Sequence, residues 1–128
     1  MNIPQHVKDV ISGQKVYVLS TASRDGKPNT IYLTFLMVHD DEHVLIADNK
    51  FFKTERNLRE NPIISFLVMD EKNRKAYQLK GRAELHTEGG LFQETVRWVK
   101  ERKPDLVPKA AVLMKVEEIY SGAEKITG

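Results

Sequence analysis

Cysteine is absent from the sequence, which excludes disulfides, thiolate zinc sites, iron–sulfur clusters and a cysteine nucleophile. The sequence also lacks a large excess of one sign of charge, since it contains 20 Lys and Arg residues and 18 Asp and Glu residues. The resulting net charge of +2 does not indicate a dedicated nucleic-acid binder. The longest uninterrupted apolar run, Ala110 to Met114, is too short to cross a membrane. Residues 3–6 open no apolar signal region, so we expect a cytoplasmic protein.

Familiar catalytic motifs are also missing. The sequence has no Gly-x-Ser-x-Gly elbow, no HExxH pair and no Walker loop. His39 and His43 flank three acidic residues, but turn chemistry already accounts for these acids. We therefore assign no metal site and no catalytic residue.

What is present is the composition of a globular protein, with 41% hydrophobic and 30% charged residues. The length of 128 residues suits one core, and no repeat or linker divides the chain. We therefore expect residues 1–128 to form a single domain.

Six segments have the alternation, or the β-branched and aromatic content, that is typical of strands. They are residues 15–23, 29–38, 43–48, 63–69, 75–86 and 110–120. The links between the first three are short, which favours antiparallel neighbours. Residues 63–69 are almost continuously apolar, so we expect this strand to be buried on both faces.

Helical spacing is found in three other places. Ile3, Val7, Val10 and Ile11 predict a short N-terminal helix. Residues 51–61 and 91–103 predict two more helices, each ended by a proline. With so few crossover helices, the six strands favour a mainly β fold: an antiparallel barrel with flanking helices. Strands that are apolar on both faces leave more apolar surface than one barrel can bury, which predicts a homodimer.

A candidate anion site lies where the third strand gives way to the helix at 51–61. Lys50, Lys53 and Thr54 fall in the loop and the first helical turn. Free N–H groups at a helix start attract anions, and a phosphate monoester fits that chemistry. The plainer interpretation is a helix capped by Thr54 with solvated lysines.

The second strand offers a further candidate surface. Thr30 and Tyr32 share one face of it, and Asn29 stands at its start. These side chains are consistent either with the wall of a ligand cleft or with an ordinary half-exposed barrel face.

In this order, the segments VYVLSTAS, NTIYLTFLMV, LIAD, KFFKTERNLRENP, IISFLVM and KAYQLKGRAELHT resemble the pyridoxamine 5′-phosphate oxidase-like family of FMN-binding split β-barrels. The resemblance covers nearly the whole chain and is greatest to the small stand-alone FMN-binding proteins. It implies a six-stranded antiparallel split β-barrel that binds FMN at a homodimer interface. A flavin-dependent oxidoreductase or electron-transfer role follows, in which the flavin carries the chemistry.

The resemblance also implies which residues hold the cofactor. The phosphate would be bound by Lys53 and Thr54, with Lys50 nearby, and a strand of the partner subunit around Tyr77 and Gln78 would cover the flavin. The ring would lie along two strands, against Thr30, Ile31, Tyr32, Ala47, Asp48 and Asn49.

Two departures narrow this expectation. Pyridoxamine phosphate oxidase itself carries a further basic and aromatic stretch, which does not follow Tyr120 here, so we do not expect that activity. Lys53 stands where arginine is common in the family. Relatives of this architecture bind F420 or haem, and an F420-dependent reductase is the nearest alternative.

An alternative from another class is a non-enzymatic barrel that binds single-stranded nucleic acid or a protein. Lys80, Arg82 and Tyr77 would be its basic and aromatic elements. The neighbouring Glu84 and the low aromatic content of 8% count against it. The sequence leaves the substrate and the electron donor or acceptor open.

Overall fold

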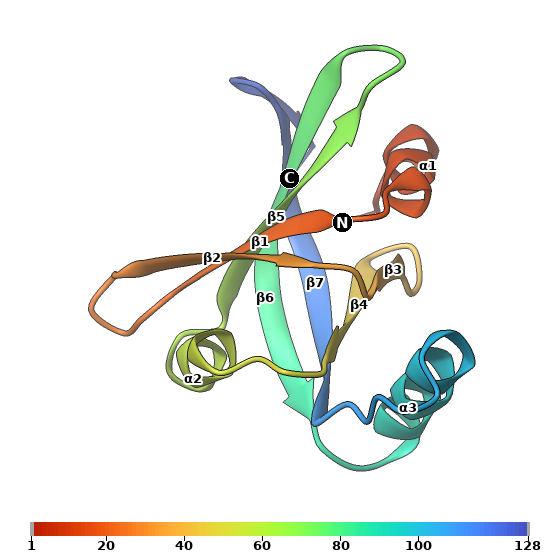
Figure 1. The fold of residues 1–128 in the computed structure, drawn as a ribbon. Helices are drawn as coiled ribbons and strands as arrows, with labels where there is room; N and C mark the ends of the chain where they lie inside the picture. Colours follow the sequence, from red (N-terminus) through yellow and green to blue (C-terminus); the bar gives the residue numbers. More distant parts are fainter. Residues whose placement is uncertain (1, 128) are drawn as a thin grey trace.

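The computed structural model describes residues 2–127 and shows a curled antiparallel sheet with three helices packed on it (Figure 1). The helices are α1 (Gln5–Gly13), α2 (Lys53–Glu60) and α3 (Gly90–Arg102). The strands are β1 (Tyr17–Ala22), β2 (Pro28–Leu33), β3 (Leu36–Val38), β4 (His43–Asp48), β5 (Ile63–Asp70), β6 (Lys75–His86), β7 (Ala110–Ser121) and β8 (Glu124–Thr127). The mainly β class with flanking helices is therefore confirmed.

The strands follow the order β2-β1-β5-β6-β7-β4-β3, and β8 pairs with β7. The two edge strands, β2 and β3, are consecutive in the chain, so the sheet curls round to bring its edges together. This is a split-barrel architecture. All the pairs are antiparallel, as the short connections predicted.

The prediction of six strands was wrong, because the sheet formed by residues 2–127 contains eight. The predicted strand 29–38 divides at Thr34 and Phe35 into β2, which pairs with β1, and β3, which pairs with β4. Leu33, Phe35 and Leu36 are all buried around this break in the strand. The short strand β8 lies beyond the last segment that the alternation had indicated.

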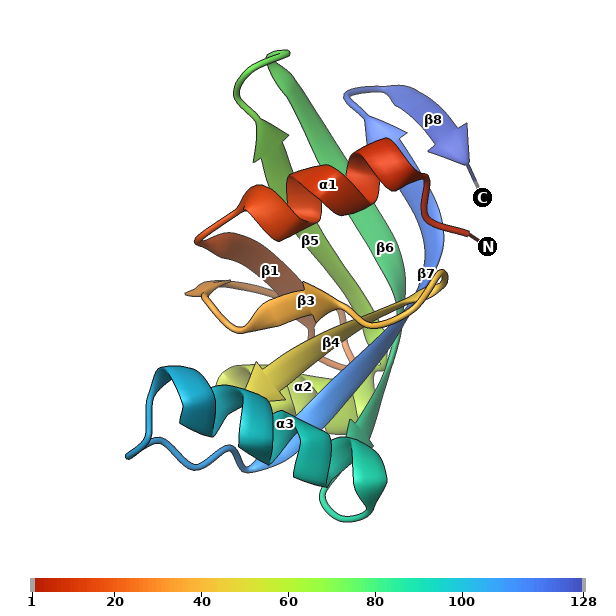
Figure 2. The same ribbon diagram turned by 90° about the vertical axis from the view of Figure 1, so that its right-hand side faces the viewer.

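The main core fills the concave side of the sheet. Phe66 of β5 packs edge-on against Tyr17, whose hydroxyl donates a hydrogen bond to the Ile11 carbonyl of α1 at 2.6 Å. Figure 2 shows α1 and α3 on the same side of the sheet, with β3 and β4 between them. A second, smaller core joins α3 to the sheet through Val99 and Phe35.

One close approach in the sheet requires glycine. A register shift lies between Lys80 and Gly81 where β6 meets β7. A Cβ atom on Gly81 would stand 1.8 Å from the Lys115 carbonyl oxygen. Only a residue without a side chain allows the two strands to approach so closely there.

The convex side of the sheet is different. On β5, Ile63, Leu67 and Met69 point outward and are 44–46% exposed, while Ile64 and Phe66 between them are buried. The expectation that this strand is buried on both faces is therefore wrong for the single chain. Within residues 2–127, no helix has the length and apolarity needed to span a membrane.

Candidate functional site

A cleft of about 820 Å³ opens beside the bend between β2 and β3. This volume lies within the range of ordinary small-molecule sites. Three further segments complete it: the end of β4, the first turn of α2, and the chain that leaves α3. The cleft is lined by Ile31, Tyr32, Leu33, Thr34, Phe35, Ala47, Asn49, Lys50, Phe51, Phe52, Lys53, Thr54, Lys103, Pro104, Asp105 and Leu106.

The first turn of α2 faces this cleft without a side-chain cap. Phe52 is the N-cap residue, and its side chain makes no capping hydrogen bond. The first N–H groups of a helix have no carbonyl partner within the helix, so they are free to bind an anion. Glu55 is the one acidic residue in this turn.

The interpretation of Thr54 as the helix cap is wrong. Thr54 lies inside α2, is buried, and its hydroxyl accepts a hydrogen bond from the Asn29 amide at 3.0 Å. The helix begins at Lys53, two residues earlier than a Thr54 cap would require. Asn29, which stands near the start of β2, thus fixes the first turn of α2 against the sheet.

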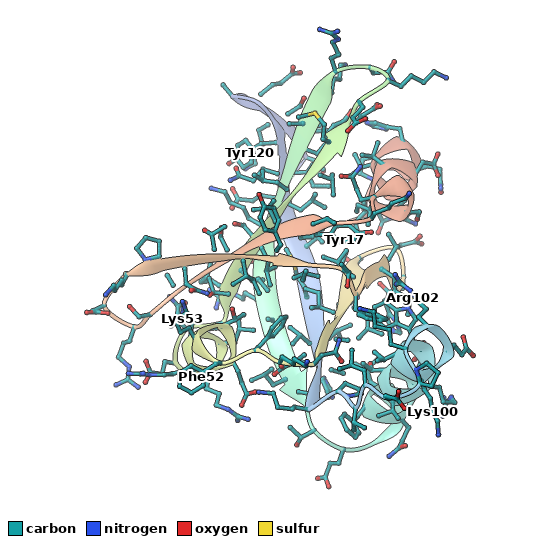
Figure 3. All side chains as sticks on the ribbon, in the orientation of Figure 1. Tyr17, Phe52, Lys53, Lys100, Arg102 and Tyr120 are labelled. Atoms are coloured by element: carbon teal, nitrogen blue, oxygen red, sulfur yellow. The ribbon has the colours of Figure 1, made fainter. Side chains whose placement is uncertain are left out.

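Positive charge gathers at the same end of the cleft. Lys50 and Lys53 are exposed, and neither forms an ion pair with any residue that the structure describes. Lys103 approaches the cleft from the other side and is likewise unpaired within residues 2–127. Figure 3 labels Lys53 and Phe52 at α2, above and below the helix in this view. The ammonium groups are therefore available to a ligand.

The rest of the cleft is largely apolar and aromatic. Ile31, Leu33 and Leu106 contribute aliphatic walls, and Tyr32 and Phe52 are each 78% exposed. Large exposed aromatic side chains beside an apolar cleft suit a flat, partly polar ring system.

Two buried polar atoms lie at the end of β4 without a hydrogen-bond partner among the described residues. They are Asp48 Oδ2 and Asn49 Oδ1. Asn49 lines the cleft, so its amide oxygen is an acceptor for a ligand N–H.

Asp48 is fully buried directly behind the cleft. Its Oδ1 accepts a hydrogen bond from the Phe51 N–H at 3.0 Å. Burial raises the pKa of the Asp48 carboxyl to about 7, and the neighbouring Glu55 adds to that rise. The pKa of Glu55 is lowered to about 2, chiefly through its interaction with the Asp48 carboxyl and also because Lys109 and Arg59 contact its carboxylate.

The structure brings seven of the eleven predicted cofactor residues to the cleft lining. Thr30 lies outside it on the convex face, where its hydroxyl contacts that of Ser20, and Asp48 lies behind it. Tyr77 and Gln78 lie on β6, away from the cleft of their own chain. The seven lining residues are Ile31, Tyr32, Ala47, Asn49, Lys50, Lys53 and Thr54.

The segment 103–106 is the part of the site that sequence reasoning missed. Its only local signal is Pro104, which ends α3. Its approach to β2 and α2 depends on how α3 packs against Phe35 and Ala47. No short-range pattern in the sequence records that packing.

The surface considered for nucleic acid lacks its aromatic element. Tyr77 is a core residue that is 4% exposed, and its ring packs edge-on against the exposed His6. Lys80 lies over the ring of Tyr120 at 5.4 Å, and Arg82 approaches Glu117 at 3.8 Å. An exposed ring beside free cations, which base stacking needs, is not formed by these residues.

Comparison with known proteins places the chain in a family. The family model described as pyridoxamine 5′-phosphate oxidase matches residues 3–122. The uncharacterized protein MJ0282 of Methanocaldococcus jannaschii is 40% identical over 109 residues, covering 84% of this chain and 72% of that protein. The chain therefore belongs to the pyridoxamine 5′-phosphate oxidase family.

Solved structures agree with this assignment at the level of the fold. HupZ of Group A Streptococcus is 27% identical, with a TM-score of 0.86 over 98% of both chains. An FMN-binding protein of Syntrophomonas wolfei is 19% identical, with a TM-score of 0.80 over 91% of this chain and 84% of that one. The haem storage protein HutZ of Vibrio cholerae is 19% identical, with a TM-score of 0.71 over the whole of this chain and 98% of that one.

Proposed function

We propose that this protein binds FMN in the cleft between β2, β4 and α2, with the phosphate at the first turn of α2. One observation carries the proposal: the uncapped first turn of an eight-residue helix opens into a ligand-sized cleft next to unpaired Lys50 and Lys53. Backbone N–H groups and ammonium groups that converge in this way are suited to a phosphate monoester.

The remainder of the cleft matches the rest of the molecule. An isoalloxazine ring is flat, has apolar edges and carries one N–H donor, and the cleft offers apolar walls with the free Asn49 amide oxygen. The FMN-binding protein of similar fold supports the same ligand. When bound, a flavin supplies hydride or electron transfer, and the chain supplies position and electrostatics. We therefore favour a redox role.

A homodimer would complete this site. On or beside the convex face of β1, β2 and β5, Val16, Leu67 and Met69 are 44–47% exposed and Tyr32 is 78% exposed. Tyr32 belongs to this face, opposite Val18, and also lines the cleft. A second chain seated on the face would bury its apolar side chains and cover the cleft at once. The Gln78 side of β6 lies on the same convex face, opposite Leu67.

Haem and the deazaflavin F420 remain the competing ligands, and the first has a weaker fit. No His, Cys or Met lines the cleft within the described residues, and Tyr32 is the one lining side chain of a type that ligates haem iron. F420 shares the flavin-like ring and phosphate, so the visible spectrum and mass of the bound ligand must separate it from FMN.

The proposal is tested by equilibrium titration of FMN and riboflavin into wild-type protein and the variant Lys53→Ala. We expect the variant to bind FMN about 10- to 100-fold more weakly, because a charge-assisted contact contributes about 1.5–3 kcal/mol. Riboflavin has no phosphate and should bind both proteins equally. Lys72→Ala, which changes an exposed lysine outside the cleft, is the control.

Equal losses for the two ligands would mean that Lys53 maintains the shape of the cleft and does not pair with a phosphate. If wild-type protein binds FMN no better than riboflavin, the phosphate is not recognised at α2, and the proposal fails.

A further inference from the structure

Two segments at the α2 end of the cleft are joined by one lysine. Residues 49–52 connect β4 to α2, and residues 103–109 connect α3 to β7. The Lys109 N–H donates a hydrogen bond to the Asp48 carbonyl at 2.7 Å, and its side-chain ammonium donates to the Phe51 carbonyl. The side chain thus reaches from the start of β7 into the turn that precedes α2.

The same ammonium also contacts two carboxyl groups from different elements. It lies 3.1 Å from Glu55 Oε2 in the first turn of α2 and 3.9 Å from Asp48 Oδ1 at the end of β4. Glu55 is held from its other side by Arg59 at 3.2 Å. Lys109 is therefore the point at which β4, α2 and the 103–109 segment meet.

The Asp48 side chain also binds the 49–52 turn, from the buried side. Its Oδ1 accepts the Phe51 N–H, while Lys109 binds the Phe51 carbonyl, so both polar groups around Phe51 are fixed by side chains outside the cleft lining. Phe51, Phe52 and Lys53 follow one another in that lining. A shift of Phe51 would move the free N–H groups of the α2 turn with it.

Four charged or titratable side chains meet in this group. Asp48, Glu55, Lys109 and Arg59 comprise two acids and two bases, and Asp48 is the fully buried member. The raised pKa of Asp48 is consistent with a neutral carboxyl beside a charged Glu55–Lys109 pair.

We propose that Lys109 and Asp48 are positioning residues that hold the 49–52 turn, and with it the first turn of α2, in the geometry that recognises a ligand phosphate. Neither residue touches the ligand. The inference rests on the proposed FMN function of the cleft. It predicts that phosphate recognition can be lost by changing a residue behind the cleft, with the ring site intact.

The test compares FMN and riboflavin affinities in wild-type protein, Lys109→Met and Lys109→Arg. We expect Lys109→Met to lower the FMN-to-riboflavin affinity ratio about tenfold, with riboflavin binding unchanged. Lys109→Arg retains a donor for the Phe51 carbonyl and should restore most of the ratio. Lys125→Met is the matched control: Lys125 is 45% exposed and ion-paired with Glu118, as Lys109 is 48% exposed and paired with Glu55.

Asp48 is tested in the same way with Asp48→Ala and Asp48→Asn. The amide of the Asn variant still accepts the Phe51 N–H and should preserve the ratio, whereas the Ala variant should lower it. Each ratio is measured at low and at high ionic strength. A loss at Lys109→Met that salt abolishes would show action at a distance through charge, which overturns the positioning role.

The two proposals fail in different ways. If wild-type protein shows no preference for FMN over riboflavin, the proposed function is wrong. If wild-type protein shows the preference and Lys109→Met keeps it in full, the FMN site stands and the positioning role of Lys109 is wrong.

Discussion

The two faces of β5 carry similarly apolar side chains but have different surroundings. On β5, Phe66 and Val68 point into the core, whereas Leu67 and Met69 point away from it and stay about half exposed. Both faces of this strand are apolar, but only the concave face is covered, by α1 and by the other strands of the curled sheet (Figure 2). The concave face therefore accounts for the fold of one chain.

The apolar side chains of the convex face are not buried by any element of the single chain. A strand with one solvated side normally alternates apolar with polar residues, as β6 does at Gln78, Lys80 and Arg82. The outward residues of β1 and β5 depart from that rule next to the cleft. Folding of the single chain accounts for the apolar residues of the concave face only, and the proposed dimer would account for those of the convex face.

The largest expected effect is on the free energy of unfolding, and it compares the two faces of β5. Phe66→Ala should lower the free energy of unfolding by about 3–5 kcal/mol, because it leaves a cavity in the core. Leu67→Ala, one residue away, should cost the single chain only about 1 kcal/mol, since in one chain the side chain is already nearly half exposed. Urea unfolding of both variants provides the comparison, and equal costs would contradict it.

A charge on the convex face should separate the proposed dimer. Leu67→Lys would place an unpaired ammonium at the interface in each chain, and we expect dimer affinity to fall by at least 100-fold, or about 3 kcal/mol. Val107→Lys, at an exposed apolar residue away from β5, is the control. Sedimentation velocity reports the outcome; a Leu67→Lys protein that sediments like wild type would place the interface elsewhere.

The buried carboxyl behind the cleft should make stability depend on pH. The folded-state pKa of Asp48 is raised to about 7, so its protonated form stabilises the fold at low pH and this contribution is lost as the pH rises from about 4 to 7. Asp48→Asn cannot lose a proton. We expect it to match wild type near pH 4 and to exceed it by about 2–4 kcal/mol near pH 8, since each unit of pKa shift corresponds to about 1.4 kcal/mol.

Thermal or urea unfolding at the two pH values measures this difference. Glu55, whose pKa is lowered to about 2, acts in the opposite direction: its contribution is lost as the pH falls from about 4.5 towards 2. A wild-type protein that gains stability relative to Asp48→Asn at high pH would show that Asp48 is not the buried acid.

The smallest effect concerns the hydroxyl of Thr54. Thr54→Val keeps the side-chain shape but removes the acceptor of the Asn29 amide, and should cost about 1 kcal/mol. Thr54→Ser keeps the hydroxyl and is the control. Differential scanning calorimetry without ligand makes the comparison, and an unchanged melting temperature in the Val variant would mean that this hydrogen bond contributes nothing.

Local pattern predicted most of the fold. The alternation of 75–86 and the proline-ended helical segments predicted β6, α2 and α3 to within two residues. The break between β2 and β3 was not predicted because residues 29–38 contain no Gly or Pro. It is visible only in the structure, where the pairing changes from β1 to β4 and both Phe35 and Leu36 are buried.

The residues of the cleft could likewise be predicted only where they are close in the sequence. Lys50, Lys53 and Thr54 were recognisable because a strand end and a helix start adjoin in the sequence. Lys103 to Leu106 enter the site from some 50 residues further along, through the packing of α3. Lys109 is visible only once β7 and β4 are paired, with Asp48 opposite Ala110.

The central claim, a dimer that holds one FMN in each cleft, is tested most directly by native mass spectrometry of the purified protein, followed by denaturation to identify the released molecule. The predicted result is a mass of two chains plus two FMN molecules. A flavin-bound single chain would contradict the shared site, and a released haem or deazaflavin would contradict FMN as the ligand.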